Sequence, residues 1–341
     1  MGPSVKAEIF QIFNSGIIPD YLNRTLITLI LKCNSSESLN NFQPIGLCNT
    51  IYKVITKLLV ARIRPVLDYL VSPLQTTFVP KRKSVDNAII VQELVHSMSK
   101  KKDKEGCMAI KIDLEKAYDR MEWRFIRDTL SLFKFSSRLS SLIKSYVTSS
   151  SISVLFTGGA LDHFLPSRGI RQGDLLSPYL FILCMEILGA FIMEKCEAKL
   201  WDPISTSRGG VTFSHLFFAD DLVLFAKADS KNCRAIRDVL DTFYDLSGQK
   251  VSAEKSRVFF SPNVGSNTRE ELCNILEFRS TPNIGKYLGF PIKQTSTPQD
   301  FGAIVERVQN RLAGWRTHLL SFARRVVLTQ ATLSTIPNYA M

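Results

Sequence analysis

The chain has 341 residues, of which 45% are hydrophobic and 22% are charged, and it contains 22 Phe. This composition excludes a disordered chain, because disordered chains lack the apolar residues that build a core. The 43 Lys and Arg residues outnumber the 31 Asp and Glu residues, which gives a net charge of +12. A polyanion is therefore the favoured partner, with nucleic acid ahead of an acidic membrane surface. At about 150 residues per domain, the length predicts two domains or one large multi-part unit.

Cysteines and apolar runs indicate the compartment. The 7 Cys are odd in number and include no C-x-x-C pair, which argues against a disulfide framework and against a cysteine zinc site. The longest apolar run, Tyr179 to Met193, is interrupted by Glu186. It is shorter than the roughly 20 residues that span a bilayer, so we expect a buried helix. With no secretory signal visible at the start, the sequence predicts an intracellular protein that is neither secreted nor embedded in a membrane.

Hydrophobic periodicity predicts strands and helices that alternate irregularly. In chain order we expect a strand at 27–31, a polar loop at 33–41, a helix at about 49–70 divided at Pro65, a helix at about 86–98, a charged turn at 100–106, a strand at 107–113, helices at about 122–133 and 137–149, a strand pair at 151–164, a helix at 179–193, two strands at 213–226, a helix at about 229–247 and a C-terminal pair of helices from about 301. Strand pairs set between helices are typical of an α+β fold rather than a doubly wound parallel sheet.

Two acidic sites interrupt apolar strand sequence. Asp113 follows Ala109-Ile-Lys-Ile112, and Asp220-Asp221 separates two apolar strands. A carboxylate in such surroundings loses hydration and needs a compensating cation. If the strands lie side by side, the three carboxylates cluster, and a pair of Mg²⁺ ions about 3.5–4 Å apart can run an in-line phosphoryl displacement. Taken alone, Asp220-Asp221 is more often an ordinary acidic hairpin turn, so the surrounding motifs decide.

Five segments supply that context, in a fixed order. They are KIDLEKAYDRMEW (111–123), SRGIRQGDLLSPYLF (167–181), HLFFADDLVLF (215–225), SGQKVSAEKS (247–256) and YLGFPI (287–292). Together they resemble the reverse transcriptase domain of non-LTR (LINE-type) retrotransposons, most closely the plant type. The resemblance covers about residues 21–339. It is typical of a fragment of a longer element, because no endonuclease, zinc knuckle or ribonuclease H sequence accompanies it.

The resemblance implies an α+β right-hand polymerase with an antiparallel palm sheet backed by helices. Residues 1–24 are expected to form an N-terminal flank, 25–293 the reverse transcriptase domain with fingers and palm, and 294–341 a truncated helical thumb. Within the domain, the fingers would occupy about 1–106 plus 123–165, and the palm about 107–122 and 166–293.

The resemblance also implies roles for single residues. Asp113, Asp220 and Asp221 would be the metal-binding catalytic carboxylates, with the Leu114 carbonyl as a further ligand, and Lys255 would protonate the departing pyrophosphate. The nucleotide would contact Lys32, Leu114, Tyr118, Gln172 and Gly173. The primer and template would contact Arg82, Arg168, Arg171, Tyr287, Leu288 and Gly289, although Arg168 and Arg171 can equally well stabilise their loop. An aromatic ring at Tyr118 leaves no space for a 2′-hydroxyl, which favours deoxynucleotides.

Some positions depart from the family pattern. Gln43 stands where an Arg would clamp the triphosphate, and a neutral amide cannot replace the bidentate grip of guanidinium on phosphate. Lys81 stands where the family has Gly, so it would be strained if its φ were positive. Leu175, Ser252 and Arg324 also replace the usual Pro, Asn and Gly.

The sequence therefore predicts RNA-directed DNA synthesis with two Mg²⁺ ions, for which Mn²⁺ can substitute, acting on an RNA template, a DNA primer and dNTPs. The alternative is a catalytically impaired remnant that only binds nucleic acid. An RNA replicase is a third hypothesis, which Tyr118 disfavours. The family resemblance implies nuclear localisation.

Overall fold

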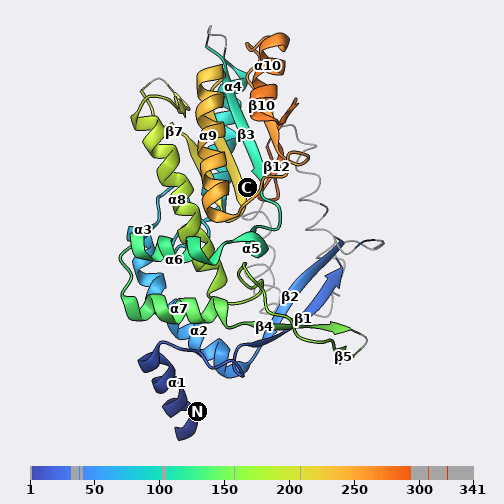
Figure 1. Cartoon of the computed structure of the whole chain (residues 1–341). Helices are drawn as coiled ribbons and strands as arrows, with labels where there is room; N and C mark the ends of the chain where they lie inside the picture. Colours follow the sequence, from blue (N-terminus) through green and yellow to red (C-terminus); the bar gives the residue numbers. More distant parts are fainter. Residues whose placement is uncertain are drawn as a thin grey trace. The chain divides into compact units, whose positions relative to one another are not determined.

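The chain divides into two compact units, each discontinuous in sequence. The computed structural model describes residues 2–31, 38, 41–101, 105–156, 158–207, 209–292, 306 and 321 (Figure 1). The first unit comprises Met1–Lys81, Asp113–Glu194 and Arg237–Ser252, and the second comprises Arg82–Ile112, Lys195–Ile236 and Ala253–Met341. The predicted Lys32 lies outside the described residues, and so does the predicted thumb apart from residues 306 and 321.

The first unit combines helices with a four-stranded sheet. Its elements are α1 (Pro3–Ser15), β1 (Arg24–Leu31), β2 (Phe42–Cys48), α2 (Thr50–Ile63), the 3₁₀ helix η2 (Arg64–Val66), α3 (Leu67–Leu70), α5 (Ala117–Arg120), α6 (Trp123–Leu132), α7 (Ser137–Thr148), β4 (Ser151–Phe156) and β5 (Gly159–Ala160), together with most of α8 (Ser177–Glu197) and the second half of α9 (Ser230–Ser247). The strand order is β2-β1-β4-β5, with β1 antiparallel to β2 and parallel to β4.

Strand β2 was not predicted, because Pro44 and Gly46 interrupt its apolar pattern. It lies at the edge of the sheet, where a proline that cannot donate a ladder hydrogen bond is tolerated. By contrast, the predicted break at Pro65 is confirmed, because α2 passes into a 3₁₀ turn there. The proline has no N–H for an intrahelical bond, and its ring disrupts the preceding turn.

Aromatic pairs organise the core of the first unit. Tyr52 of α2 and Tyr146 of α7 stack with ring centroids 5.5 Å apart and planes at 13°. Both side chains are almost fully buried. Phe125 of α6 meets Phe243 of α9 edge-on at 5.7 Å. Such pairs contribute about 0.5–1.5 kcal/mol beyond their buried area, so they fix the helices against each other.

The second unit contains a five-stranded sheet. Its elements are α4 (Ser84–Ser99), β3 (Cys107–Asp113), β6 (Ile204–Ser205), β7 (Thr212–Phe213), β8 (His215–Phe218), β9 (Asp221–Lys227), β10 (Arg257–Phe260), α10 (Ser266–Leu276), β11 (Arg279–Thr281), β12 (Gly285–Tyr287) and β13 (Phe290–Ile292). The five-stranded order is β11-β10-β3-β9-β8. Strand β10 is antiparallel to β3 and β8 to β9, whereas β11 joins the edge in parallel.

Two of the inner strands, β3 and β9, explain the apolar runs in the sequence. Residues 222–226 of β9 are all buried, and so are residues 107–110 of β3. A strand buried on both faces reads as a continuous hydrophobic run rather than an alternating one. Helix α4 packs on this sheet against β8, and the Asn87 side chain donates a 3.0 Å hydrogen bond to the Phe217 carbonyl. Helix α4 therefore stabilises β8, the strand that precedes Asp220.

The backbone at Lys81 is left-handed, with φ of 69°, as the family's glycine at this position predicts. An L-residue in this region is strained by about 1–2 kcal/mol, whereas glycine adopts it freely at an entropic cost of about 0.5–1 kcal/mol. We expect Lys81→Gly to raise the free energy of unfolding by roughly 0.5–1 kcal/mol, measured from the urea midpoint at constant m-value. Lys83→Gly is the control, because Lys83 has φ of −120°. Equal effects of the two substitutions would contradict the strain at Lys81.

Candidate active site

The acidic hairpin turn joins β8 to β9. Phe218 pairs with Asp221, which leaves Ala219 and Asp220 as a two-residue turn. Two-residue hairpin turns require a positive φ at their first position, and Ala219 has φ of 53°. A strained non-glycine residue of this kind persists where surrounding structure enforces it, often at functional sites. The turn leaves Asp220 exposed and Asp221 half-buried, so the two carboxylates lie at the tip and the base of the bend.

Asp113 is the last residue of β3, and β3 neighbours β9 in the sheet order. The Asp113 carbonyl accepts a 2.9 Å hydrogen bond from the Ser252 amide, and the Glu115 amide donates at 2.8 Å to the Lys250 carbonyl. Between these bonds, Leu114 forms an antiparallel bridge with Val251. In this pattern the polar groups of the central residue point away from the partner strand. The bridge therefore does not use the Leu114 carbonyl, which suits its predicted role as a ligand.

The donor chemistry of these residues fits a hard divalent cation. Carboxylate and carbonyl oxygens are the ligands that Mg²⁺ and Mn²⁺ favour. Within the residues that the structure describes, no three His, Cys, Asp or Glu side chains are gathered into a ready-made metal-binding group. Like charges repel, so a bound cation would stabilise carboxylates that lie close together.

Tyr118 lies in the short helix α5 and stacks on Phe181 of α8. The two ring centroids are 4.9 Å apart and the planes are nearly parallel, at 8°. Phe181 is fully buried, whereas Tyr118 is half-buried. The tyrosine ring is therefore fixed from one side by the core.

The loop that carries Gln172 and Gly173 docks on the edge of β2. The Gly46 amide donates a 3.1 Å hydrogen bond to the Gln172 carbonyl. Gly173 has φ of 88°, and a Cβ there would lie 3.2 Å from Cγ2 of Ile45. Only glycine meets both conditions without strain. The Gln172 side chain donates at 3.4 Å to Asp119, the residue after Tyr118. The structure thus brings Gln172 and the Tyr118 segment together within the first unit.

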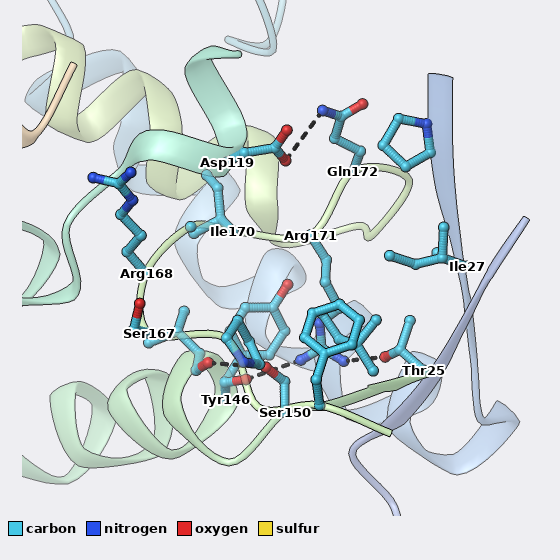
Figure 2. Close-up of a pocket in the computed structure, with 17 residues that line it drawn as sticks. Thr25, Ile27, Asp119, Tyr146, Ser150, Ser167, Arg168, Ile170, Arg171 and Gln172 are labelled. Atoms are coloured by element: carbon cyan, nitrogen blue, oxygen red, sulfur yellow. Dashed lines mark hydrogen bonds between the residues drawn. The ribbon is translucent and has the colours of Figure 1, made fainter. Parts of the chain in front are cut away.

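A cavity of about 380 Å³ lies behind this loop (Figure 2). Its walls include Ile27, Ile152, Phe164 and Ile170, and Arg168 and Gln172 also line it. Arg168 is exposed and pairs with Glu122 at 3.4 Å. Ion pairs this exposed contribute little to stability.

Arg171 points to the opposite side of the loop from Gln172 (Figure 2). Its guanidinium donates to Thr25 Oγ1 at 2.9 Å, to the Tyr146 carbonyl at 2.9 Å and to the Tyr52 hydroxyl. Of the two roles that the sequence left open for Arg171, these contacts support loop stabilisation.

The YLG segment forms a second tight turn, in the second unit. Tyr287 pairs with Phe290 across β12 and β13, and both turn residues, Leu288 and Gly289, have positive φ, at 52° and 83°. Burial raises the pKa of Tyr287, and the Asp221 carboxylate raises it further. This electrostatic effect shows that the structure brings the predicted primer-contact residue into the neighbourhood of Asp221.

Lys255 and Arg82 are the remaining predicted site residues. Lys255 is exposed in a turn just before β10, and Arg82 is half-buried just before α4. The turn is fixed at both ends, because the Ser252 amide bonds to Asp113 and Arg257 pairs with Lys111 of β3. The Lys111 ammonium in turn donates to the Lys286 carbonyl at 2.6 Å, which ties β12 to β3.

Sequence reasoning missed the aromatic residues behind the site. Phe181 supports Tyr118, and Tyr52 and Tyr146 surround Arg171. Phe181 belongs to the quoted motif 167–181, which could have pointed to it. Tyr52 was not singled out, because its helix looked like ordinary core. No helix among the described residues is long and apolar enough to cross a membrane.

Similarity to a solved structure shows the fold. The chain resembles apo telomerase from Candida tropicalis truncated from its C-terminal domain, with a TM-score of 0.52, 16% identity, and coverage of 77% of this chain and 55% of that one. At this identity the likeness shows the fold, which is that of a right-hand polymerase. The expected α+β fold class is confirmed.

The sequence comparisons define the family. The model described as reverse transcriptase (RNA-dependent DNA polymerase) matches residues 30–292. The chain belongs to this reverse transcriptase family, among the domains found in non-LTR retrotransposons.

Two curated relatives illustrate the relationship. The chain is 24% identical to the transposon TX1 uncharacterized 149 kDa protein of Xenopus laevis, over 98% of this chain and 25% of that protein. It is 26% identical to the retrovirus-related Pol polyprotein from the type-2 retrotransposable element R2DM of Drosophila melanogaster, over 89% of this chain and 30% of that protein. The chain thus spans about a quarter to a third of the length of these relatives.

Proposed function

We propose that this chain is the RNA-directed DNA polymerase domain of a non-LTR retrotransposon, which extends a DNA primer on an RNA template. The observation that supports the proposal is the sheet order: β3, which ends at Asp113, neighbours β9, which begins at Asp221 after a turn with a strained residue. The proposed site of action is the nucleus, where an element that copies itself into genomic DNA must act.

Asp113, Asp220 and Asp221, with the Leu114 carbonyl, are the proposed holders of two Mg²⁺ ions. When bound, such ions lower the pKa of an attacking hydroxyl and stabilise the leaving pyrophosphate. The chain's own residues position the reactants. Hydrogen bonds and packing hold the segments that carry Gln172 and Tyr118, and Tyr287 lies near Asp221.

Tyr118 and Lys255 have distinct proposed roles. The Tyr118 ring, backed by Phe181, excludes a 2′-hydroxyl and selects deoxynucleotides. Lys255, exposed at the end of a fixed turn, donates a proton to the pyrophosphate oxygen as the P–O bond breaks. The exposure of Lys255 leaves it accessible to a bound triphosphate.

A primer-extension assay tests the proposal. The purified chain, a labelled DNA primer on an RNA template and all four dNTPs are expected to give extended products with Mg²⁺ or Mn²⁺. Chelation of the metal with EDTA is expected to abolish extension, and re-addition to restore it. Replacing dNTPs with rNTPs is expected to lower incorporation strongly. Extension that is unaffected by EDTA would contradict the carboxylate assignment.

The second candidate function is a nucleic-acid-binding remnant. It is favoured by Gln43, which is exposed on β2 in place of the usual Arg, and by the strained Lys81. In that case the chain would bind an RNA–DNA hybrid with steep salt dependence and would extend no primer with either metal.

A further inference from the structure

Arg171 occupies a site built for a guanidinium. Its charged group lies over the ring of Tyr52 at 4.5 Å and near the ring of Tyr146 at 5.1 Å, where the negative face of an aromatic ring attracts a cation. These are the same two rings that stack on each other in the core. The arginine therefore adds its charge to an existing aromatic pair.

Hydrogen bonds fix the guanidinium in its plane. Its acceptors, Thr25 of β1, the Tyr52 hydroxyl and the Tyr146 carbonyl, come from a strand and two helices. Asp174, which is buried, interacts electrostatically with the same cation. A guanidinium is planar and rigid and has five N–H donors, so it can donate hydrogen bonds in several directions at once. A lysine ammonium is a compact point charge.

The loop next to Arg171 is held at two further places. The Ile170 amide donates at 2.8 Å to the Tyr118 carbonyl. The Gln172 carbonyl accepts from Gly46 of β2, as described above. Arg171 lies between these two attachments. Its contacts therefore fix the position of Ile170, which bonds to Tyr118, relative to Gln172, which bonds to Gly46.

We propose that Arg171 is a positioning residue, which through Tyr52, Thr25 and Tyr146 fixes the Gln172–Gly173 loop in its nucleotide-binding position without touching the nucleotide. This inference rests on the proposed function for its effect on nucleotide use. Its structural part, the anchoring of the loop, stands independently.

The experiment compares Arg171→Lys with Tyr52→Phe. Arg171→Lys keeps the positive charge and removes the planar guanidinium. Tyr52→Phe keeps the aromatic ring and removes the hydroxyl that accepts one of the hydrogen bonds. Arg138→Lys is the matched control, because Arg138 of the same unit donates from Nε to the Phe13 carbonyl at 2.7 Å, away from this loop. Each variant is measured for hydrogen exchange in peptides covering 167–176, for Tm, and for the KM and kcat of dNTP incorporation.

We expect Arg171→Lys to speed amide exchange in the loop by about tenfold and to raise the KM for dNTP by about tenfold, with kcat within about twofold; these follow from the loss of charge-assisted hydrogen bonds. Tyr52→Phe should act in the same direction by about threefold, and its milder change guards against misfolding. Arg138→Lys should change neither quantity.

The outcomes separate the two proposals. Unchanged loop exchange in both variants would overturn the positioning role, and so would a loss of Tm and active fraction at constant KM, which indicates a purely structural role. If the wild-type chain extends no primer, the proposed function fails, and loop exchange alone still decides whether Arg171 anchors the loop.

Discussion

Replacing Asp220 with Ala is expected to lower primer extension by about a thousandfold or more, because loss of this proposed metal ligand would remove several kcal/mol of charge stabilisation from the transition state. The side chain is exposed at the tip of the β8–β9 turn, so its removal leaves the hydrophobic core intact. Single-turnover extension with saturating dNTP measures the effect on the chemical step.

Asp241→Ala is the control for this substitution. Asp241 is also an exposed acidic residue, and it pairs with Arg237 on the surface of α9 at 3.0 Å. We expect it to retain wild-type extension. Both variants should keep the wild-type Tm. An Asp220→Ala protein that folds and extends primers normally would end the catalytic assignment of the turn.

Gln43→Arg is expected to improve nucleotide use by roughly 10- to 100-fold in kcat/KM, because a charge-assisted contact with phosphate contributes about 1.5–3 kcal/mol. Gln43 lies on β2 two residues before Ile45, whose Cγ2 would lie 3.2 Å from a Cβ added at Gly173. Residues two apart on a strand share a face. An arginine here would therefore project from the face next to the predicted nucleotide loop.

Gln11→Arg controls for added positive charge. Gln11 is exposed on α1, so an arginine there raises the net charge equally without approaching β2. A gain confined to Gln43→Arg, seen as a lower KM for dNTP at constant ionic strength, would support a phosphate contact at this position. Equal gains from both variants would indicate only stronger attraction of nucleic acid.

The strand ends that carry the acidic residues could be predicted from sequence. Asp113 and Asp220 interrupt apolar runs, and such a run is encoded locally by hydrophobic pattern. The structure confirms a strand that ends at Asp113 and a turn at Asp220. The strain expected at Lys81 is also confirmed, because Lys81 has a positive φ. This expectation concerned the backbone of a single residue, so it needed no knowledge of distant contacts.

The supporting contacts could not be predicted, because they depend on distant pairs. Arg171 and Thr25 are 146 positions apart. No local sequence pattern indicates that the Thr25 hydroxyl would accept a hydrogen bond from the Arg171 guanidinium. Both alternatives for Arg171 therefore remained open in the sequence. The same holds for the stack of Phe181 on Tyr118 and for the left-handed backbone of Ala219. Tertiary packing determines both features, whereas local sequence propensity does not.

The span of the Arg171 contacts also bears on biosynthesis. Contacts between residues far apart in sequence slow folding, since a long loop must close before they form. At about 5–20 residues per second, a ribosome needs roughly 7–30 s to make the stretch between Thr25 and Arg171. During that interval the nascent β1 and α2 lack the arginine whose guanidinium donates hydrogen bonds to Thr25 and Tyr52 in the folded protein.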